Sequence, residues 1–485
     1  MLERAELGHR VGKRAYEAAL PKLRSDLLAA HFELRDEKFP VIVIVSGADG
    51  AGKGELVHRL NEWLDPRGVE THAFWRASAE ETERPPYWRF WRAMPGRGRI
   101  GIFFGSWYSD PIVRRVYGET RGRQLAASLD RIVAFERMLV DDGALLVKLW
   151  MHLPRSAQRR ALEKLERSGR ITPTDWKHFD LYDRFRRVSE QALARTHDPR
   201  APWHPIDATD RRHRELEVGR ILLRSLRARI DARDAKPRKV PVPAARAGSR
   251  GALDRVDLAR KLAASEYAAA LGKHQERLSR LAWKAWHRRR SMVIVFEGWD
   301  AAGKGSAIRR VTQALDPRLY RVVGVAAPTD EELAHHYLWR FWRHVPRAGR
   351  AVIFDRSWYG RVLVERVEGF ASPAAWGRAY GEINDFEAQL AEGGVIVVKL
   401  WIHLSPEEQL RRFEERKRIA YKRYKITDED WRNREKWKPY ESAVEDMIAR
   451  TSTEHAPWTI VAGDDKRFAR VQIVKTIVKG LQRAL

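Results

Sequence analysis

A glycine-rich stretch in the second half of the chain, EGWDAAGKGS at 297–306, has the residue types and spacing of a phosphate-binding loop. The β-branched and apolar run 292–298 predicts a strand that ends at Gly298, and after four further residues Gly303 and Lys304 open a predicted helix. In such a loop the backbone N–H groups and the helix N-terminus bind phosphate oxygens, and the lysine adds a positive charge. The stretch therefore predicts a phosphate site.

The loop departs from the usual pattern at the position where a magnesium ligand is expected. The Ser or Thr that usually follows the lysine is Gly305 here, and Ser306 stands one place later. Asp300, inside the loop, offers a carboxylate in place of the missing hydroxyl. A glycine-rich turn that binds nothing is the alternative, but it gives no role to the lysine or to the helix that follows.

The stretch AVIFDRSWYGR at 351–361 places a second carboxylate near the same loop. Asp355 ends a predicted buried strand, where a carboxylate is costly unless it meets a cation. We therefore expect it to bind Mg²⁺ and expect Arg356 and Arg361 to hold phosphate by charge-assisted hydrogen bonds. The alternative is an Asp that caps a helix, with both arginines on a solvated face.

A strongly basic segment follows a later predicted strand, between 410 and 438. Charge runs of this kind are usually solvated helix faces, and most of these residues are expected to be so. The segment nevertheless occupies the position where phosphotransferases fold a lid that excludes water from the reaction. Some of its cations are therefore expected to face phosphate.

The predicted phosphate-binding loop occurs twice in the chain. SGADGAGKGE at 46–55 repeats its pattern 251 positions earlier. Asp49 corresponds to Asp300 and Lys53 to Lys304 at that offset, and WRFWR, SWY and VKLW recur in the same register. A repeat of domain length indicates duplication of one fold. We predict an N-terminal domain at 1–236, a linker rich in Pro, Gly, Ala and Arg at 237–252, and a C-terminal domain at 253–485. The aromatics of WRFWR are expected to pack in cores rather than to stack on bases.

Each half alternates apolar strands with helical stretches, which predicts an α/β fold. Four strands are expected in each copy. Three lie at 41–47, 99–105 and 143–153 in the first copy and at 292–298, 350–356 and 393–404 in the second, and WTIVAGDD at 458–465 indicates a fourth near the end. Continuous apolar strands separated by helices predict a parallel sheet with helices on both faces, a three-layer α/β/α arrangement. Ligands bind such sheets at the carboxyl ends of the strands.

The net charge indicates that the partners are polyanions but does not select one of them. The chain of 485 residues carries 92 Lys and Arg against 65 Asp and Glu, a net charge of +27 that attracts polyanions such as nucleic acid, inorganic polyphosphate or charged nucleotides. Hydrophobic residues at 44% favour folded domains, and no apolar run reaches the length of a membrane span. The chain has no cysteine and no secretory signal, so we expect a cytoplasmic protein without disulfides.

Motifs through 291–478 resemble the polyphosphate kinase 2 family. These are, in order, GWDAAGKGS, DRSWYGR, VKLWIHLSPEEQLRRFEERK, ITDEDWRNREKW and RTSTEHAPWTIVAGDDKRFAR. A tandem chain with a complete second copy resembles the two-domain branch, the polyphosphate:AMP phosphotransferases. The resemblance implies two P-loop kinase domains of the thymidylate kinase type, each with a helical lid, and Mg²⁺-dependent phosphoryl transfer from inorganic polyphosphate to AMP, giving ADP.

The resemblance also implies roles for individual residues. Asp300 and Asp355 would bind Mg²⁺, while Lys304 and Arg356 would stabilise the transferring phosphoryl group. The lid reads YKRYKIT where single-domain members more often have a Pro and a Trp, so its assignments depart from the family pattern. The remaining phosphate-binding candidates are Gly298, Gly303, Gly305, Ser306, Arg361, Arg416, Lys422, Arg423 and Lys425.

The first copy keeps Asp49 and Lys53 but loses the other charged positions. Phe104 and Gly105 stand where the second copy has Asp355 and Arg356, and Asp110 stands where it has Arg361. We therefore expect one working site, in the second half.

Three rival functions stay open at this point: a polyphosphate kinase acting on ADP or GDP, an ATP-using kinase, and a nucleic-acid-binding module. The last leaves Asp300 and Asp355 without a role, so nucleic acid is not the expected partner. By analogy with multimeric single-domain relatives, we expect a homo-oligomer, a dimer of tandem chains.

Overall fold

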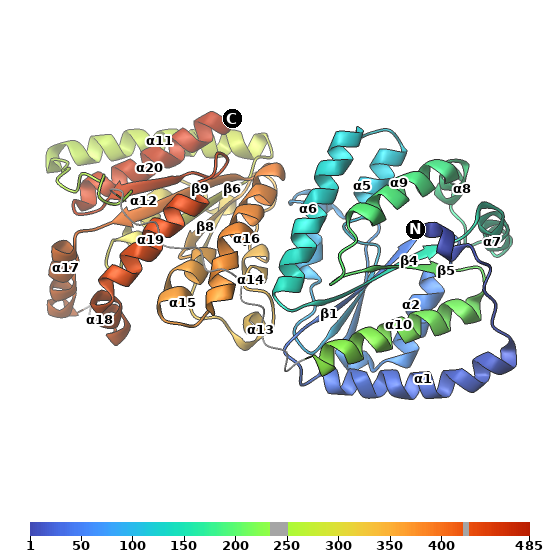
Figure 1. The fold of residues 1–485 in the computed structure, drawn as a ribbon. Coiled ribbons are helices and arrows are strands. Elements are labelled where there is room, and N and C mark those ends of the chain that lie inside the picture. The colour runs from blue at the N-terminus through green and yellow to red at the C-terminus, as the bar shows by residue number, and fades with distance from the viewer. Residues whose placement is uncertain (233–250, 421–425) are drawn as a thin grey trace. The chain divides into compact units, whose positions relative to one another are not determined.

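The computed structural model describes residues 1–232, 251–420 and 426–485. The chain divides into two compact units (Figure 1). The first comprises Met1–Ala77, Arg89–Pro237 and Asp330–His336, and the second comprises Ser78–Trp88, Arg238–Thr329 and Tyr337–Leu485. Each unit thus includes one short segment from the other half of the sequence. The predicted linker at 237–252 lies outside the described residues except for its last two positions.

Each unit contains one five-stranded sheet in which all neighbouring strands are parallel. The strand order is β2-β3-β1-β4-β5 in the first unit and β10-β9-β6-β8-β7 in the second. The first sheet consists of β1 (Val41–Gly47), β2 (Val69–Ala73), β3 (Ile100–Phe104), β4 (Leu145–His152) and β5 (Trp203–Asp207). The second consists of β6 (Met292–Gly298), β7 (Tyr320–Gly324), β8 (Ala351–Asp355), β9 (Ile396–His403) and β10 (Trp458–Ala462).

The four strands expected in each copy are confirmed, and the fifth was missed. The central strands β1 and β6 are buried along almost their whole length, as their continuous apolar runs predict. The missed strands, β2 and β7, lie at one edge of each sheet and expose most of their side chains. Their sequences, VETHA and YRVVG, therefore carry no buried apolar run that would mark a strand.

Helices cover both faces of each sheet, which confirms the α/β fold of two tandem parallel-sheet domains. In the first unit, α1 and α10 lie side by side and pack with α2 over the sheet, while α5, α6 and α9 lie on its other side (Figure 1). Helices α11 and α20 form the corresponding pair in the second unit.

The helices of the first half are α1 (Lys13–Leu34), α2 (Lys53–Trp63), α3 (Ala79–Thr82), α4 (Trp88–Arg92), α5 (Ser109–Val116), α6 (Gly122–Asp141), α7 (Arg155–Arg167), α8 (Pro173–Asp180), α9 (Tyr182–Arg195) and α10 (Arg211–Asp231). Those of the second half are α11 (Ala264–His287), α12 (Lys304–Thr312), α13 (Asp330–Leu333), α14 (Trp339–Trp342), α15 (Val364–Val367), α16 (Pro373–Glu392), α17 (Pro406–Arg418), α18 (Asp428–Glu435), α19 (Trp437–Thr451) and α20 (Lys466–Ala484). Short 3₁₀ helices occupy Leu2–Ala5, Pro66–Gly68, Pro317–Leu319 and Trp358–Val362. Within the described residues no helix is both long and apolar enough to cross a membrane.

The repeated SWY and VKLW motifs build a buried ionic network. In the second unit the Lys399 ammonium donates to Glu387 (2.7 Å), to the Tyr359 hydroxyl (2.7 Å) and to the Thr451 carbonyl (2.6 Å). Trp358 Nε1 donates to the same carboxylate at 3.1 Å. Because the lysine and the glutamate are both fully buried, each depends on the other for charge neutralisation. These residues of the two motifs therefore stabilise the fold.

The first unit repeats this network. Lys148 donates to Glu136 at 2.7 Å and to the Thr196 carbonyl at 2.8 Å, and Trp107 and Tyr108 donate to Glu136. The repeat thus preserves the internal support of both sheets. The WRFWR aromatics are buried as expected, with Trp91 and Trp342 each 1% exposed.

Candidate functional site

The predicted phosphate loop joins β6 to α12 at the carboxyl edge of the second sheet. The loop leaves the strand at Gly298, where φ is 149° and a Cβ would lie 2.6 Å from the Ile402 carbonyl oxygen, so glycine is required. It re-enters helix at Gly303, which has φ 100° and caps α12. The Lys304 ammonium folds back onto the loop and donates to the carbonyls of Gly298 (2.7 Å) and Trp299 (3.2 Å).

The guanidinium of Arg412 supports the loop from α17. Its NH1 group donates to the carbonyls of Ala301 and Ala302 at 3.1 Å each, and its NH2 group donates to the Gly463 carbonyl at 2.7 Å. Arg412 is 2% exposed and its Nε lies 2.6 Å from Glu408. The sequence analysis placed this arginine in a general basic run. The loop carbonyls that identify its role come from distant positions in the chain.

The carboxylate of Asp300 is held by two side chains from different elements. Arg356 NH2 donates to Asp300 Oδ1 at 3.3 Å, and Asn433 Nδ2, from α18, donates to Asp300 Oδ2 at 3.0 Å. Arg356 itself follows β8 with a left-handed backbone, φ 66°, and its N–H donates to the Phe296 carbonyl at 3.1 Å. The sequence predicted no role for Asn433. Its motif, NREKW at 433–437, is nevertheless absent from the first copy, and this difference marks the segment.

Asp355 ends β8 beside the same arginine. Its carboxylate makes no hydrogen bond or ion pair with any side chain in the part of the chain that the structure describes. Burial lowers the pKa of Arg356, but the nearby carboxylates, Asp300 first and Asp355 among the others, outweigh this effect and raise it. The two predicted carboxylates and Arg356 therefore share one electrostatic environment.

A third carboxylate, Glu297, lies beneath the loop and was not predicted. It is 5% exposed, and Ser357 Oγ donates to its Oε1 at 2.7 Å. Burial raises the pKa of Glu297, while the Ser357 hydrogen bond and the charges of Lys304 and Arg356 act in the opposite direction. Because the charges of Lys304 and Arg356 both act on the pKa of Glu297, the two cations lie near the same carboxylate.

The residues at this edge fit a magnesium ion that is shared with phosphate. The described residues contain no group of three His, Cys, Asp or Glu arranged to hold a metal by themselves. Mg²⁺ is, however, commonly bound through one or two carboxylates, with water and substrate phosphates completing its shell. Asp300 and Asp355, which makes no ion pair with a described side chain, could supply such a pair.

The next predicted phosphate-binding residues to consider are Ser306, Gly305 and Arg361. Ser306 Oγ donates to the Gly303 carbonyl at 2.9 Å and accepts from Arg470 at 3.3 Å, and Gly305 lies in the first turn of α12. Arg361 pairs with Glu365 at 3.1 Å and lies 4.4 Å from the centre of the Tyr337 ring.

Of the residues predicted to form the lid, some lie outside the part of the chain that the structure describes. Arg416 lies on α17, and its charge acts on Asp430 of α18, where burial is the larger influence and raises the pKa. The predicted lid cations Lys422, Arg423 and Lys425 lie outside the described residues.

The loop of the first unit has the same course but a different electrostatic arrangement. Asp49 is paired with Lys53 at 3.3 Å and with His178 Nδ1 at 2.7 Å. Burial raises the pKa of Asp49, but Lys53 and His178 outweigh it and hold that pKa far below its usual range. Phe104 ends β3 and Gly105 follows it, at the positions that correspond to Asp355 and Arg356. The first loop thus neutralises its carboxylate with protein cations.

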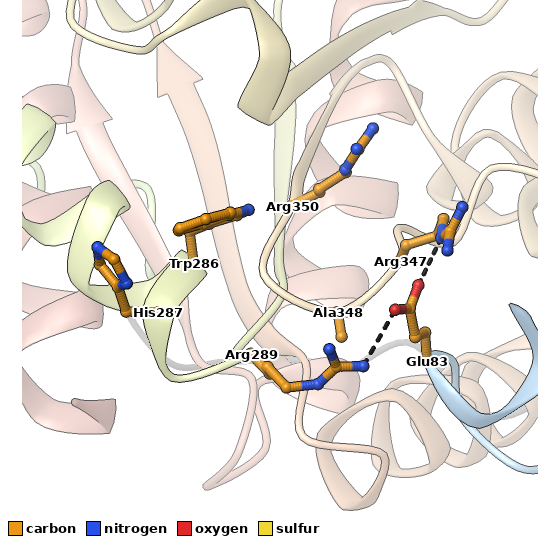
Figure 2. A pocket seen from close by; sticks show the side chains of 7 residues that line it. All are labelled: Glu83, Trp286, His287, Arg289, Arg347, Ala348 and Arg350. Atoms are coloured by element: carbon orange, nitrogen blue, oxygen red, sulfur yellow. Dashed lines mark hydrogen bonds and ion pairs between the residues drawn. The ribbon is translucent and has the colours of Figure 1, made fainter. Parts of the chain in front are cut away.

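A pocket of about 480 Å³ lies elsewhere in the second unit, lined by Glu83, Trp286, His287, Arg289, Arg347, Ala348 and Arg350 (Figure 2). Glu83 points toward Arg289 and Arg347 and forms ion pairs with them at 3.0 and 2.5 Å. Arg350 directly precedes β8, so this pocket is at the amino edge of the sheet, opposite to the phosphate loop. No candidate site residue in the described part of the chain lines it.

A parallel sheet whose first strand leads through a glycine-rich loop into a helix, with a lysine and two acidic residues at the carboxyl edge, is typical of P-loop phosphotransferases. A model of the polyphosphate kinase 2 (PPK2) family matches residues 10–234 and 261–485. The chain belongs to this family, and both of its halves match the model.

Full-length relatives share the tandem organisation. The chain is 52% identical to the polyphosphate:AMP phosphotransferase of Pseudomonas aeruginosa over 100% of this chain and 99% of that protein. It is 35% identical to the protein of the same name from Acinetobacter johnsonii, over 95% and 96% of the two chains. A crystal structure of a polyphosphate kinase 2 from Pseudomonas aeruginosa superposes with a TM-score of 0.90 at 51% identity, covering 100% of this chain and 99% of that one.

Proposed function

We propose that this protein transfers a phosphoryl group from inorganic polyphosphate to AMP, giving ADP, and that the second unit carries out the reaction. The observation that supports this most strongly is the grouping of Asp300, Lys304, Asp355 and Arg356 at one edge of the second sheet. The names of the full-length relatives support the choice of donor and acceptor.

In the proposed reaction an oxygen of the AMP phosphate attacks the terminal phosphorus of polyphosphate. The new P–O bond yields ADP, and cleavage of the terminal anhydride bond leaves polyphosphate one unit shorter. Such a transfer asks the protein mainly to position the two phosphates and to neutralise their charge. Lys304 and Arg356 supply positive charge, and the backbone N–H groups of the loop bind phosphate oxygens.

The proposal includes Mg²⁺ held by Asp300 and Asp355, where it would screen the negative charge of the donor and acceptor phosphates. Asp355 suits this role because its carboxylate makes no ion pair with the described side chains. The basic segment at 410–438 is proposed to close over the substrates and exclude water. Of the phosphate-binding candidates in that segment, Arg416 lies within the described residues, on α17.

The first unit is proposed to be inactive. Its Asp49 is already paired with Lys53 and contacted by His178, and the side chain of Phe104 has no atom that could bind a metal. Its network around Lys148 is intact, which favours a structural role or a role in guiding polyphosphate.

The proposal is tested by measuring ADP formation from AMP, long-chain polyphosphate and Mg²⁺ with the full-length protein. Asp355→Ala should reduce the rate by at least 100-fold, as expected when a group that stabilises transition-state charge is lost. Asp49→Ala is the matched control in the other copy and should retain most activity. Equal loss in both variants would contradict a single working site.

The acceptor is tested in the same assay. One relative that matches 47% of this chain at 40% identity is named an ADP-polyphosphate phosphotransferase, and another that matches 46% at 36% identity is named a GDP-polyphosphate phosphotransferase, so ADP and GDP are the appropriate competing acceptors. Phosphorylation of ADP or GDP without any of AMP would keep the mechanism and replace the acceptor. No transfer to any nucleotide, together with tight salt-dependent binding of duplex DNA, would replace the enzymatic proposal with a binding function.

A cytoplasmic location and assembly into a dimer of tandem chains are also proposed. Light scattering coupled to size-exclusion chromatography tests the assembly, and a monomeric mass would contradict it.

A further inference from the structure

Asp300 is connected to a second buried carboxylate through two polar side chains. Asn433 Nδ2 donates to Asp300 Oδ2 at 3.0 Å, and the Tyr440 hydroxyl lies 3.3 Å from Asn433 Oδ1. The same hydroxyl lies 3.2 Å from Glu368 Oε1. We call this series Asp300–Asn433–Tyr440–Glu368 the polar relay.

The chemistry of the relay fixes which way the Asn433 amide faces. A phenol hydroxyl donates one hydrogen, and the amide oxygen can only accept. When Asn433 Oδ1 accepts from Tyr440, its NH₂ group is directed at Asp300. Reversing the amide would place NH₂ toward the hydroxyl and leave two acceptor oxygens facing each other at Asp300, which is unfavourable.

The far end of the relay is neutralised within the protein. The side chain of Glu368 is 7% exposed, and Lys436 donates to its Oε2 at 2.6 Å. Arg432 lies 3.8 Å from the same oxygen. The single hydroxyl hydrogen of Tyr440 is within reach of both Glu368 Oε1 and Asn433 Oδ1, and the pairing of Glu368 with Lys436 reduces its competition with Asn433 for that hydrogen. Burial, with Glu368 second, raises the pKa of Tyr440 well above its usual value, so the hydroxyl keeps its proton.

The first unit keeps the aspartate of the relay, as Asp49, but has none of the other three members. At the corresponding positions it has His178 for Asn433, Phe185 for Tyr440, Tyr117 for Glu368 and Leu181 for Lys436. These aromatic rings pack together, with His178 4.7 Å from Phe185 and 5.8 Å from Tyr117 between ring centres. The contact to the loop aspartate is then made by an imidazole that can carry a positive charge.

The two arrangements differ at the second carboxylate oxygen of the loop aspartate. Asp300 and Asp49 each pair with one cation at Oδ1, Arg356 and Lys53 respectively. Oδ2 of Asp300 accepts from a neutral amide, which orients the carboxylate and adds no second charge, whereas Oδ2 of Asp49 contacts the His178 imidazole. We propose that Asn433 is a positioning residue, which acts through Asp300, and that Tyr440 and Glu368 orient it so that the second unit binds its divalent cation. This inference rests on the proposed function, in which Asp300 is a metal ligand.

The test measures Mn²⁺ binding to the full-length protein by electron paramagnetic resonance of the free ion, together with the Mg²⁺ dependence of phosphoryl transfer. Asn433→Ala should weaken Mn²⁺ binding by about 10- to 100-fold, the range found when outer-shell partners of metal ligands are removed. Tyr440→Phe should weaken it in the same direction but less. His178→Ala is the matched control in the first unit and should bind Mn²⁺ as the wild type does.

The Mg²⁺ dependence separates positioning from general damage. For Asn433→Ala, the Mg²⁺ concentration that gives half-maximal rate should rise, and the rate at saturating Mg²⁺ should recover most of the wild-type value. Wild-type Mn²⁺ binding in both Asn433→Ala and Tyr440→Phe would overturn the relay.

Asp300→Asn distinguishes this failure from that of the proposed function. If Asp300→Asn weakens Mn²⁺ binding while both relay variants do not, the metal role of Asp300 stands and the relay is wrong. If Asp300→Asn also binds Mn²⁺ normally, the metal role itself is wrong. Should Asn433→Ala fail to fold, Tyr440→Phe decides the question, because it removes one oxygen atom only.

Discussion

The indole of Trp299, in the phosphate loop, stacks on the indole of Trp437 at the start of α19, with ring centres 3.9 Å apart and planes inclined by 11°. On its other side, Trp299 Nε1 donates to His403 Nδ1 at 3.0 Å. The residue directly before Asp300 is therefore fixed by contacts from two other elements. The site depends on this packing as well as on its charged groups.

Removing the stacking partner should loosen the loop. Trp437→Ala is expected to lower stability by more than about 1 kcal/mol, because it removes an aromatic pair worth roughly that amount and the apolar burial of the indole as well. The rate of ADP formation should fall by about tenfold or more, because small displacements of reacting groups are costly. Trp437→Phe retains a stacking ring and should stay close to the wild type. Unchanged activity in Trp437→Ala would show that the stack does not position the loop.

His403 makes stability depend on pH. Burial lowers its pKa to about 4, and the hydrogen bond from Trp299 requires an unprotonated Nδ1. The unfolded chain, with a His pKa of about 6.5, binds more protons than the folded chain between these values. Stability from this group is thus complete above about pH 6.5 and declines toward pH 4, by about 3 kcal/mol in total.

Urea denaturation at several pH values between 7 and 4.5 measures this contribution. His403→Gln does not titrate in this range, so it should lose less stability than the wild type as the pH falls. Parallel losses in the two proteins would contradict the assignment to His403.

The buried pair Lys399–Glu387 should dominate the stability of the second unit. Lys399→Met leaves the Glu387 carboxylate buried without its ammonium partner, which typically costs about 3–5 kcal/mol. Adding Glu387→Gln removes the stranded charge and should restore much of that loss. Urea denaturation followed by tryptophan fluorescence measures both variants. A single variant as stable as the wild type would show that the network is not needed for folding.

The sequence predicted the parts of this molecule that are local. Strands β1 and β6, the phosphate loops and the position of Asp355 follow from apolar runs and glycine spacing. The edge strands β2 and β7 were missed because their exposed side chains form no apolar run. The repeat itself marked the charged positions that the first copy has lost.

The residues that contact the loop or the site carboxylates, namely Arg412, Asn433 and Glu297, were missed for a different reason. Arg412 and Asn433 lie in a segment that reads as a solvated basic run, and their partners are loop atoms more than 100 positions away in sequence. Glu297 could have been noticed, because the first copy has Ser46 at that position. Its burial and its hydrogen bond to Ser357 nevertheless depend on how β6 and β8 pair.

The backbone conformation of Arg356 is unfavourable for stability, whereas its side chain is expected to serve activity. Its φ of 66° lies in the left-handed region, which costs a non-glycine residue about 1 kcal/mol, and the first copy has Gly105 with φ 80° there. Arg356→Gly should therefore be more stable than Arg356→Ala by about that amount in urea denaturation. Both variants lose the guanidinium that contacts Asp300, so both should form ADP at least 100-fold more slowly. If Arg356→Gly kept its activity, the guanidinium would have no part in transfer; if it were no more stable than Arg356→Ala, the strain at this turn would be absent.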